Sequence, residues 1–199
     1  STNCVAHLID GVLLETVDTV DRATLTPQLS TTADAIAAAG LNESDSPLRN
    51  QTLTLFAPTD AAYLGLQVDD LTNNADLLGR ILQYHAVPDA RIRSGDLSGG
   101  ETPATLEGGN LNIAVNDGSV TVNGIPVSTT DVETENATIH LIDGVLLQRI
   151  DIYERASITD GLETLTAAVE AAGLDASDSP LRNDDPVTVF APVDSAFAD

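Results

Sequence analysis

The chain has 199 residues, of which 31 are acidic, eight are arginine and none is lysine, so its formal net charge is −23 at pH 7. This composition excludes nucleic acid as a partner, because phosphate binding needs clustered Lys and Arg. The sequence has no transmembrane segment, since no run approaches the 18 apolar residues that a membrane span needs. Cys4 is the only cysteine and cannot by itself form a metal site or an intramolecular disulfide.

The acidity has three interpretations. We favour adaptation to molar salt, because acidic residues are spread along the whole chain and bulky side chains are scarce. Like charges at this density repel one another, and salt screens them over about 8 Å at 0.15 M and about 3 Å at 1 M. The alternatives are an ordinary acidic secreted protein and a calcium-loaded surface module. Neither Asp69-Asp70 nor Asp184-Asp185 lies in a loop of the twelve-residue calcium pattern, which favours a solvated acidic face.

The first half of the chain predicts helices around one buried strand. Thr26 and Pro27 are typical of a helix start, and Gly40 of a helix end. Residues 53–56 form a short apolar run that stops at Ala-Pro, as a buried strand does. Another helix is expected to start at Asp60, and residues 72–85 have a helical apolar stripe.

The second half predicts antiparallel strands. Residues 111–115 and 119–122 flank an Asn-Asp-Gly turn, and Asn-Gly leads into residues 125–127. Residues 138–147 form a long closing strand. Helices followed by strands give an α+β fold.

A tandem repeat sets the domain organisation. The octapeptide that begins at His7 recurs letter for letter at His140, an offset of 133 residues, which is the size of an independent domain. We expect residues 1–16 to be the C-terminal strand of a preceding unit, residues 17–148 a complete unit, and residues 149–199 the N-terminal part of a following unit. In that following unit a helix should begin at Thr159 or Asp160 and end at Gly173, and residues 187–190 should form a strand. The two partial copies are expected to be the least ordered parts.

Three segments of the complete unit resemble the fasciclin-like domain, a family of secreted and cell-surface adhesion modules. They are Thr54-Leu-Phe-Ala-Pro-Thr-Asp-Ala-Ala-Tyr63, Leu82-Gln-Tyr-His-Ala-Val-Pro88 and Ile139-His-Leu-Ile-Asp-Gly-Val-Leu-Leu147. The resemblance implies a wedge of mostly antiparallel strands packed with several helices. It also implies a role outside the cell.

The motif residues are candidates for function or for holding the fold. In animal relatives the segment matching Tyr84 and His85 has been implicated in integrin binding, but His85 lies on an apolar helix stripe, which favours a buried structural role. A hydrogen bond between His85 and Asp143 or another motif carboxylate is one expectation. His140 and Asp143 should point to opposite faces of a strand, which is poor geometry for a shared site. Asp60, with Asp194 in the other copy, is expected to cap a helix.

Asn42, Asn50 and Asn136 each begin an N-glycosylation triplet, a weak indication of an external compartment. No catalytic motif or phosphate loop is present in the sequence, and no cofactor is expected. The leading hypothesis is a non-enzymatic adhesion or matrix module from a tandem array, which binds a cell-surface or matrix protein, a glycan or its own kind. The alternative is a module that binds a small apolar ligand such as a carotenoid, against which the 3% aromatic content argues.

Overall fold

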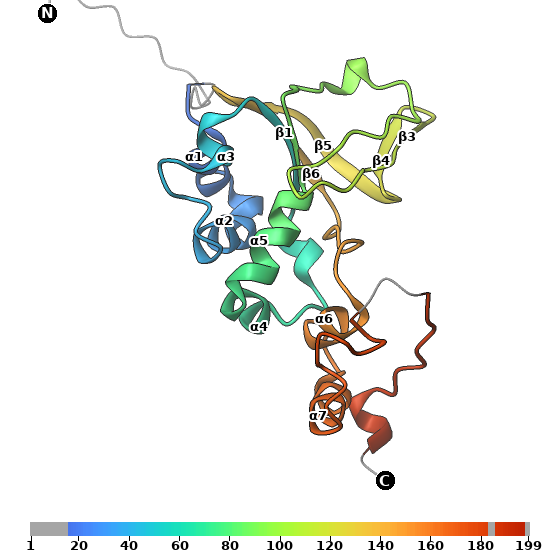
Figure 1. The fold of residues 1–199 in the computed structure, drawn as a ribbon. Coiled ribbons are helices and arrows are strands. Elements are labelled where there is room, and N and C mark those ends of the chain that lie inside the picture. Colours follow the sequence, from blue (N-terminus) through green and yellow to red (C-terminus); the bar gives the residue numbers. More distant parts are fainter. Residues whose placement is uncertain (1–15, 183–185, 198–199) are drawn as a thin grey trace, which may run out of the picture.

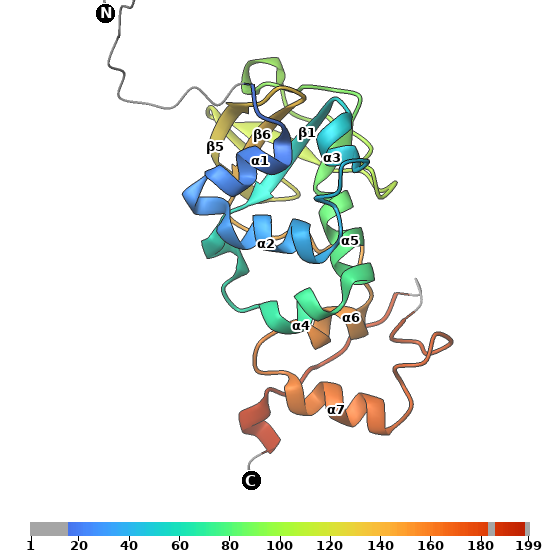
Figure 2. The same cartoon turned by 90° about the vertical axis from the view of Figure 1, so that its left-hand side faces the viewer.

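The computed structural model describes residues 16–182 and 186–197 as a six-stranded sheet with helices on one side and at one end (Figures 1 and 2). The α-helices are α1 (Thr19–Leu25), α2 (Ser30–Ala38), α3 (Pro47–Asn50), α4 (Val68–Asn73), α5 (Ala75–Tyr84), α6 (Ile152–Ser157) and α7 (Glu163–Ala171). Short 3-10 helices span Pro27–Leu29, Asp60–Tyr63, Ser94–Asp96 and Asp194–Phe197. The strands are β1 (Leu53–Pro58), β2 (Ala86–Pro88), β3 (Ile113–Asn116), β4 (Ser119–Val122), β5 (Ile125–Glu133) and β6 (Ala137–Ile142).

The sheet has the order β2-β1-β6-β5-β4-β3. Only β1 and β6 run parallel, and every other pair is antiparallel, so the predicted α+β fold with mostly antiparallel strands is confirmed. All six residues of β1 and of β6 are buried, because β1 and β6 are neighbours in the middle of the sheet and each is paired on both sides.

Two apolar clusters fill the interior. The larger cluster joins α1, α2, α4 and α5 to one face of β1 and β6, with Ile36, Leu55 and Ile139 at most 2% exposed. The smaller cluster lies between the opposite face of β1 and β6 and the β3–β4 hairpin, around Phe56 and Ile113. Figure 2 shows α1 and α2 lying across the face of the sheet.

One of three predicted boundaries is correct and two are wrong, each for a local reason. The helix predicted to end at Gly40 does so, since Gly40 has φ +68° and the amide of Leu41 donates back to the carbonyl of Ile36. The predicted helix of residues 72–85 is instead two helices, because the side chain of Asn74 caps α5 by accepting from the amide of Leu77 at 3.1 Å. The closing strand stops at Ile142 rather than at residue 147, where the chain bends at Asp143 and Gly144.

The strand predicted at residues 187–190 is absent. The described residues around it offer no neighbouring strand, and Phe190 is 93% exposed. In the middle unit the equivalent strand, β1, is hydrogen-bonded on both sides by β2 and β6. An isolated apolar run has no partner for its backbone and therefore does not form a strand. The predicted closing strand of residues 1–16, with Cys4, falls on residues 1–15, which lie outside the described residues.

Candidate functional site

His85 is fully buried at the C-terminal end of α5 and joins that helix to the segment after β6. Its Nδ1–H donates to the carbonyl of Ile81 at 2.7 Å, and its Nε2 accepts from the amide of Leu146 at 2.9 Å. Burial lowers the pKa of His85 to about 4, although the hydrogen bond to Ile81 acts in the opposite direction. The ring is therefore neutral at pH 7. The expected hydrogen bond to Asp143 is wrong, because both ring nitrogens are used by the backbone.

Tyr84 is 3% exposed and holds the same helix end to the hairpin region. Its hydroxyl donates to the carbonyl of Asn110 at 2.9 Å and accepts from Nδ2 of Asn123 at 3.0 Å. The ring lies so close to Gly109 that a Cβ there would be 2.9 Å from Cε2 of Tyr84. Neither side chain of the tyrosine–histidine motif is accessible to a partner without opening the core.

His140 lies in β6 and supports the neighbouring strand and loop. Its ring stacks on Phe56 with centroids 5.4 Å apart, and Nε2–H donates to the carbonyl of Ile92 at 2.9 Å. Nδ1 accepts weakly from the amide of Asp131 at 3.4 Å, where β5 is irregular. Burial lowers the pKa of His140, although the hydrogen bond to the carbonyl of Ile92 and the nearby carboxylates of Asp131 and Glu133 act to raise it. Asp143 is exposed, and the structure does not bring it together with His140.

Asp60 caps a helix, but not the one that it begins. Its carboxylate accepts from the amide of Thr31 at 2.7 Å and from the hydroxyl of Ser30 at 2.8 Å, so it caps α2, which lies earlier in the chain. Burial raises the pKa of Asp60, but these hydrogen bonds outweigh it and leave the pKa below its usual value. Asp194 repeats the arrangement in the following copy, where it accepts from the amide of Thr164 at 2.8 Å.

The three glycosylation triplets differ in what their asparagine does. Asn136 is engaged on both sides of its amide: Oδ1 accepts from the amide and hydroxyl of Thr19, and Nδ2 donates to the carbonyls of Leu48 and Gln51. A glycan on Nδ2 would displace these bonds. Asn50 is exposed but donates to the carbonyl of Ser44. Asn42 is exposed in the loop after α2.

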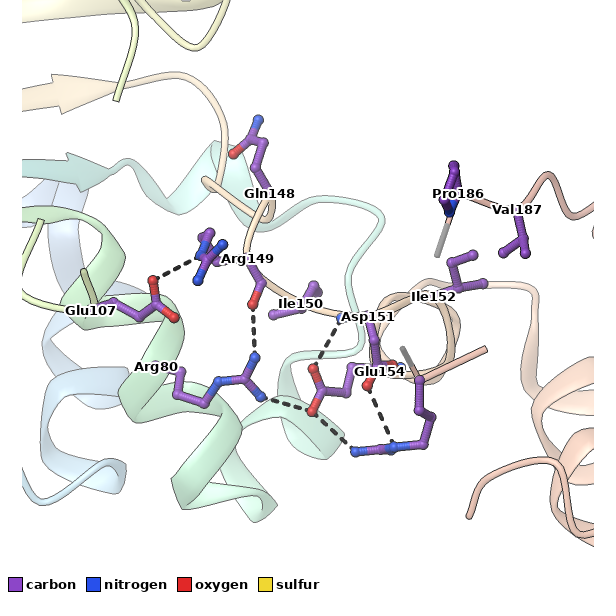
Figure 3. Close-up of a pocket in the computed structure, with 11 residues that line it drawn as sticks. Arg80, Glu107, Gln148, Arg149, Ile150, Asp151, Ile152, Glu154, Pro186 and Val187 are labelled. Carbon is purple, nitrogen blue, oxygen red and sulfur yellow. Dashed lines mark hydrogen bonds and ion pairs between the residues drawn. The ribbon is translucent and has the colours of Figure 1, made fainter. Parts of the chain in front are cut away.

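A polar hollow of about 510 Å³ lies where α6 meets α5 (Figure 3). Arg80 donates from Nη1 to Glu154 at 2.9 Å and from Nη2 to the carbonyl of Arg149 at 2.8 Å. Arg182 pairs with the same carboxylate of Glu154 at 3.4 Å and with Asp151 at 3.5 Å. Three of the eight arginines therefore line one hollow between the middle unit and the following copy.

The chain is similar to known proteins in both sequence and fold. The family model described as the Fasciclin domain matches residues 27–148. The chain belongs to the fasciclin domain family. The matched range covers most of the middle unit, including all three motifs.

Known proteins are similar to this chain over different lengths. Human periostin is 32% identical over 212 residues, which cover all of this chain but 24% of periostin. Protein sll1483 of Synechocystis is 39% identical over 123 residues, covering 59% of this chain and 66% of that protein. A solved FAS1 domain pair from the insect cell adhesion molecule fasciclin I shares the fold, with a TM-score of 0.55, 23% identity, and coverage of 66% of this chain and 51% of that one. The chain thus spans about a quarter of periostin.

The described residues show few features of an apolar-ligand pocket, a metal site or a membrane-spanning helix. An apolar hollow lined by α6, α7 and residues near Val189 holds about 170 Å³, well below the roughly 300–1,000 Å³ of typical ligand pockets. No group of three or more His, Cys, Asp or Glu side chains in this part of the chain is arranged to hold a metal ion. None of its helices combines the length and apolarity that crossing a bilayer requires. Nothing here favours the carotenoid-type alternative.

Sequence reasoning missed the polar hollow between the units. A signal was present, because Asp18, Asp21 and Arg49 recur as Asp151, Glu154 and Arg182 at the repeat offset of 133. The spacing alone does not say that these side chains meet. It also gives no sign of Arg80, which joins them from the middle unit.

Proposed function

We propose that this fasciclin chain is a non-enzymatic adhesion or matrix module that works outside the cell as part of a tandem array. In this proposal residues 1–16 close a preceding unit, residues 17–148 are one complete unit, and residues 149–199 begin the next. Its partner is a cell-surface or matrix protein, a glycan, or another copy of the array.

The observation that carries the proposal is the direct joining of the middle unit to the next copy. The amide of Gln67 donates to the carbonyl of Ile158 at 2.9 Å, and Ile158 is 1% exposed within the core of the middle unit. Arg80 of the middle unit and Glu154 of the next copy add an ion pair in the polar hollow between them. Consecutive units coupled in this way present their outer surfaces at a set spacing, which suits binding through many weak contacts.

The motif residues support this assignment by their positions. Tyr84, His85 and His140 are each buried and bonded inside the unit. Their role in the proposal is to hold the fold, so recognition falls to the outer surface. That role differs from the direct partner contact that the family resemblance implied for Tyr84 and His85.

Adaptation to high salt belongs to the same proposal. Six of the eight arginines are already paired with carboxylates, namely Arg49, Arg80, Arg91, Arg93, Arg149 and Arg182. Arginine therefore neutralises only a small share of the 31 acidic residues. The remaining negative charge repels within and between units unless salt screens it. A glycan on Asn42 is compatible with this surface, because that side chain is exposed.

Adhesion can be tested with beads coated with the whole chain. Clustering of the beads with one another, or their capture by cells or by purified envelope glycans, is measured in 0.2 M and 3 M KCl. Beads coated with the heat-unfolded chain are the control, since they carry the same charge without the fold. We expect binding by the folded chain in 3 M KCl. Absence of clustering and of capture at both salt concentrations would reject the adhesion function.

A further inference from the structure

Helices α1 and α6 are equivalent elements of two successive units. The offset of 133 residues places Leu25 on Ile158 and Asp21 on Glu154. Each helix begins at an aspartate cap, and each carries the same ion-pair arrangement with a later arginine. Arg49 pairs with Asp18 and Asp21, and Arg182 pairs with Asp151 and Glu154.

The two helices differ in which face is covered. In α1 the inner face is buried against its own unit, with Thr19, Val20 and Ala23 at most 4% exposed. In α6 the equivalent residues Ile152, Tyr153 and Ala156 line an open apolar hollow. The inner face is therefore filled in the complete unit and open in the partial one.

The outer faces show the reverse. Leu25 is 54% exposed, whereas Ile158 is 1% exposed. The side chain of Asp21 is 54% exposed, whereas that of Glu154 is 11% exposed. The difference arises because α4, α5 and the segment before them cover the outer face of α6, through Gln67 on the carbonyl of Ile158 and Arg80 on Glu154.

We infer that the outer face of α1, formed by Asp21 and Leu25, is a docking surface for the α4–α5 face of another fasciclin unit. The occupant is the preceding unit of the array, so the inference rests on the array in the proposed function. An arginine at the position of Arg80 in that unit would pair with Asp21, as Arg80 of the middle unit pairs with Glu154. Its apolar surface covers Leu25, as the middle unit covers Ile158.

Two differences make this docking weaker than the junction at α6. The amide of Asp160 donates to the carbonyl of Gly65 at 3.2 Å, but the equivalent residue on the α1 side is Pro27, which has no amide hydrogen. Asp21 is also one methylene shorter than Glu154. The docked face therefore keeps the apolar contact and the ion pair and loses one backbone hydrogen bond.

The test compares the present chain with a lengthened chain in which residues 15–147 occur twice in succession, so that every native residue is kept and a complete unit precedes the second α1. Cys4→Ser removes the only native cysteine from both proteins. A single reporter cysteine, Leu25→Cys, is placed in the present chain and in the second copy of the lengthened chain, and its alkylation rate is measured. Ile158→Cys in the present chain calibrates the rate of a covered position.

We expect the reporter to react at least tenfold more slowly in the lengthened chain, approaching the rate of the Ile158 position. Arg80→Ala in the first copy should make the reporter react at least threefold faster. Arg93→Ala in the first copy, which is remote from the junction, should leave the rate unchanged.

Asp21→Cys is a second reporter that leaves Leu25 intact. Equal rates in the two chains for both reporters, or a slowing that grows with protein concentration, would overturn the inference. The rates do not depend on adhesion, so this result stands apart from the bead assay.

Discussion

The carboxylate of Asp60 accepts the backbone amide hydrogen of Thr31 over a distance of 2.7 Å. The residue that begins one short helix thus caps another helix 29 residues earlier. Asp194 and Thr164 repeat this contact in the following copy, although strand β1 has no counterpart among the described residues there. The cap therefore forms without the sheet, and it belongs to the helical part of the fasciclin unit.

Replacing Asp60 tests the strength of this cap. Asp60→Ala should lower the free energy of unfolding by about 1 kcal/mol, because the first turn of α2 loses its acceptor. Asp60→Asn keeps an acceptor oxygen and should lose less. Since the folded pKa of Asp60 is below its unfolded value, its charge-dependent stabilisation is complete above about pH 4 and is lost as pH falls through the folded pKa. Urea unfolding at pH 7 measures both variants, and equal stability of Asp60→Ala and the native chain would contradict the cap.

His85 should make the unfolding free energy depend on pH. Its folded pKa of about 4 lies below the unfolded value of about 6.5, so its stabilisation is complete above pH 6.5 and is lost as pH falls toward 4. His85→Ala should cost about 1–3 kcal/mol at pH 7, because the amide of Leu146 and the carbonyl of Ile81 lose their partner.

The difference between the native chain and His85→Ala should narrow by about 2 kcal/mol between pH 7 and pH 5, at about 1.4 kcal/mol per pH unit below 6.5. Denaturant titrations at several pH values provide the measurement. A difference that stays constant over this range would mean that His85 is not held neutral by burial.

Two glycines provide a matched pair for packing. A Cβ at Gly109 would lie 2.9 Å from Cε2 of Tyr84 and 2.9 Å from Cδ of Arg149, so Gly109→Ala should cost about 1–3 kcal/mol through crowding. A Cβ at Gly79, inside α5, would have no atom of another element within 4 Å, and Gly79→Ala should stabilise the helix by up to about 1 kcal/mol. Thermal unfolding should therefore show midpoint shifts of opposite sign.

Asn136 and Asn42 share a sequence pattern but differ in structure. Asn136→Ala should cost about 1–3 kcal/mol, because Thr19, Leu48 and Gln51 lose its hydrogen bonds. Asn42→Ala at an exposed loop position should change stability by less than about 0.5 kcal/mol. Unfolding of the unglycosylated proteins makes the comparison, and equal effects of the two substitutions would show that the Asn136 bonds contribute nothing.

Salt should stabilise the native chain. Raising KCl from 0.1 M to 3 M screens the repulsion among the acidic side chains, and each kcal/mol regained raises the thermal midpoint by about 2–4 °C for a chain of this size. The surface ion pairs weaken in the same salt, but exposed pairs of this kind are worth at most about 1 kcal/mol each. An unchanged midpoint between the two salt concentrations would refute adaptation to high salt.

The sequence by itself determined the features that short stretches encode. The repeat offset, the Gly40 helix end, the Asn-Asp-Gly turn and the α+β order were all readable, because each depends on a few neighbouring residues with a local conformational preference. The motifs were also sufficient to indicate the fasciclin family.

Only the tertiary structure decided which distant groups meet. The sequence placed His85 on an apolar stripe, but the amide of Leu146 became its partner only when α5 docked beside the segment after β6. The apolar run at residues 187–190 shows the same dependence, because a strand needs neighbours to bond its backbone. Asn136 looked like a glycan acceptor until α1 and α3 were found against it. Local preference acts within a few residues, whereas hydrogen-bond partners are set by packing between elements that lie tens of residues apart.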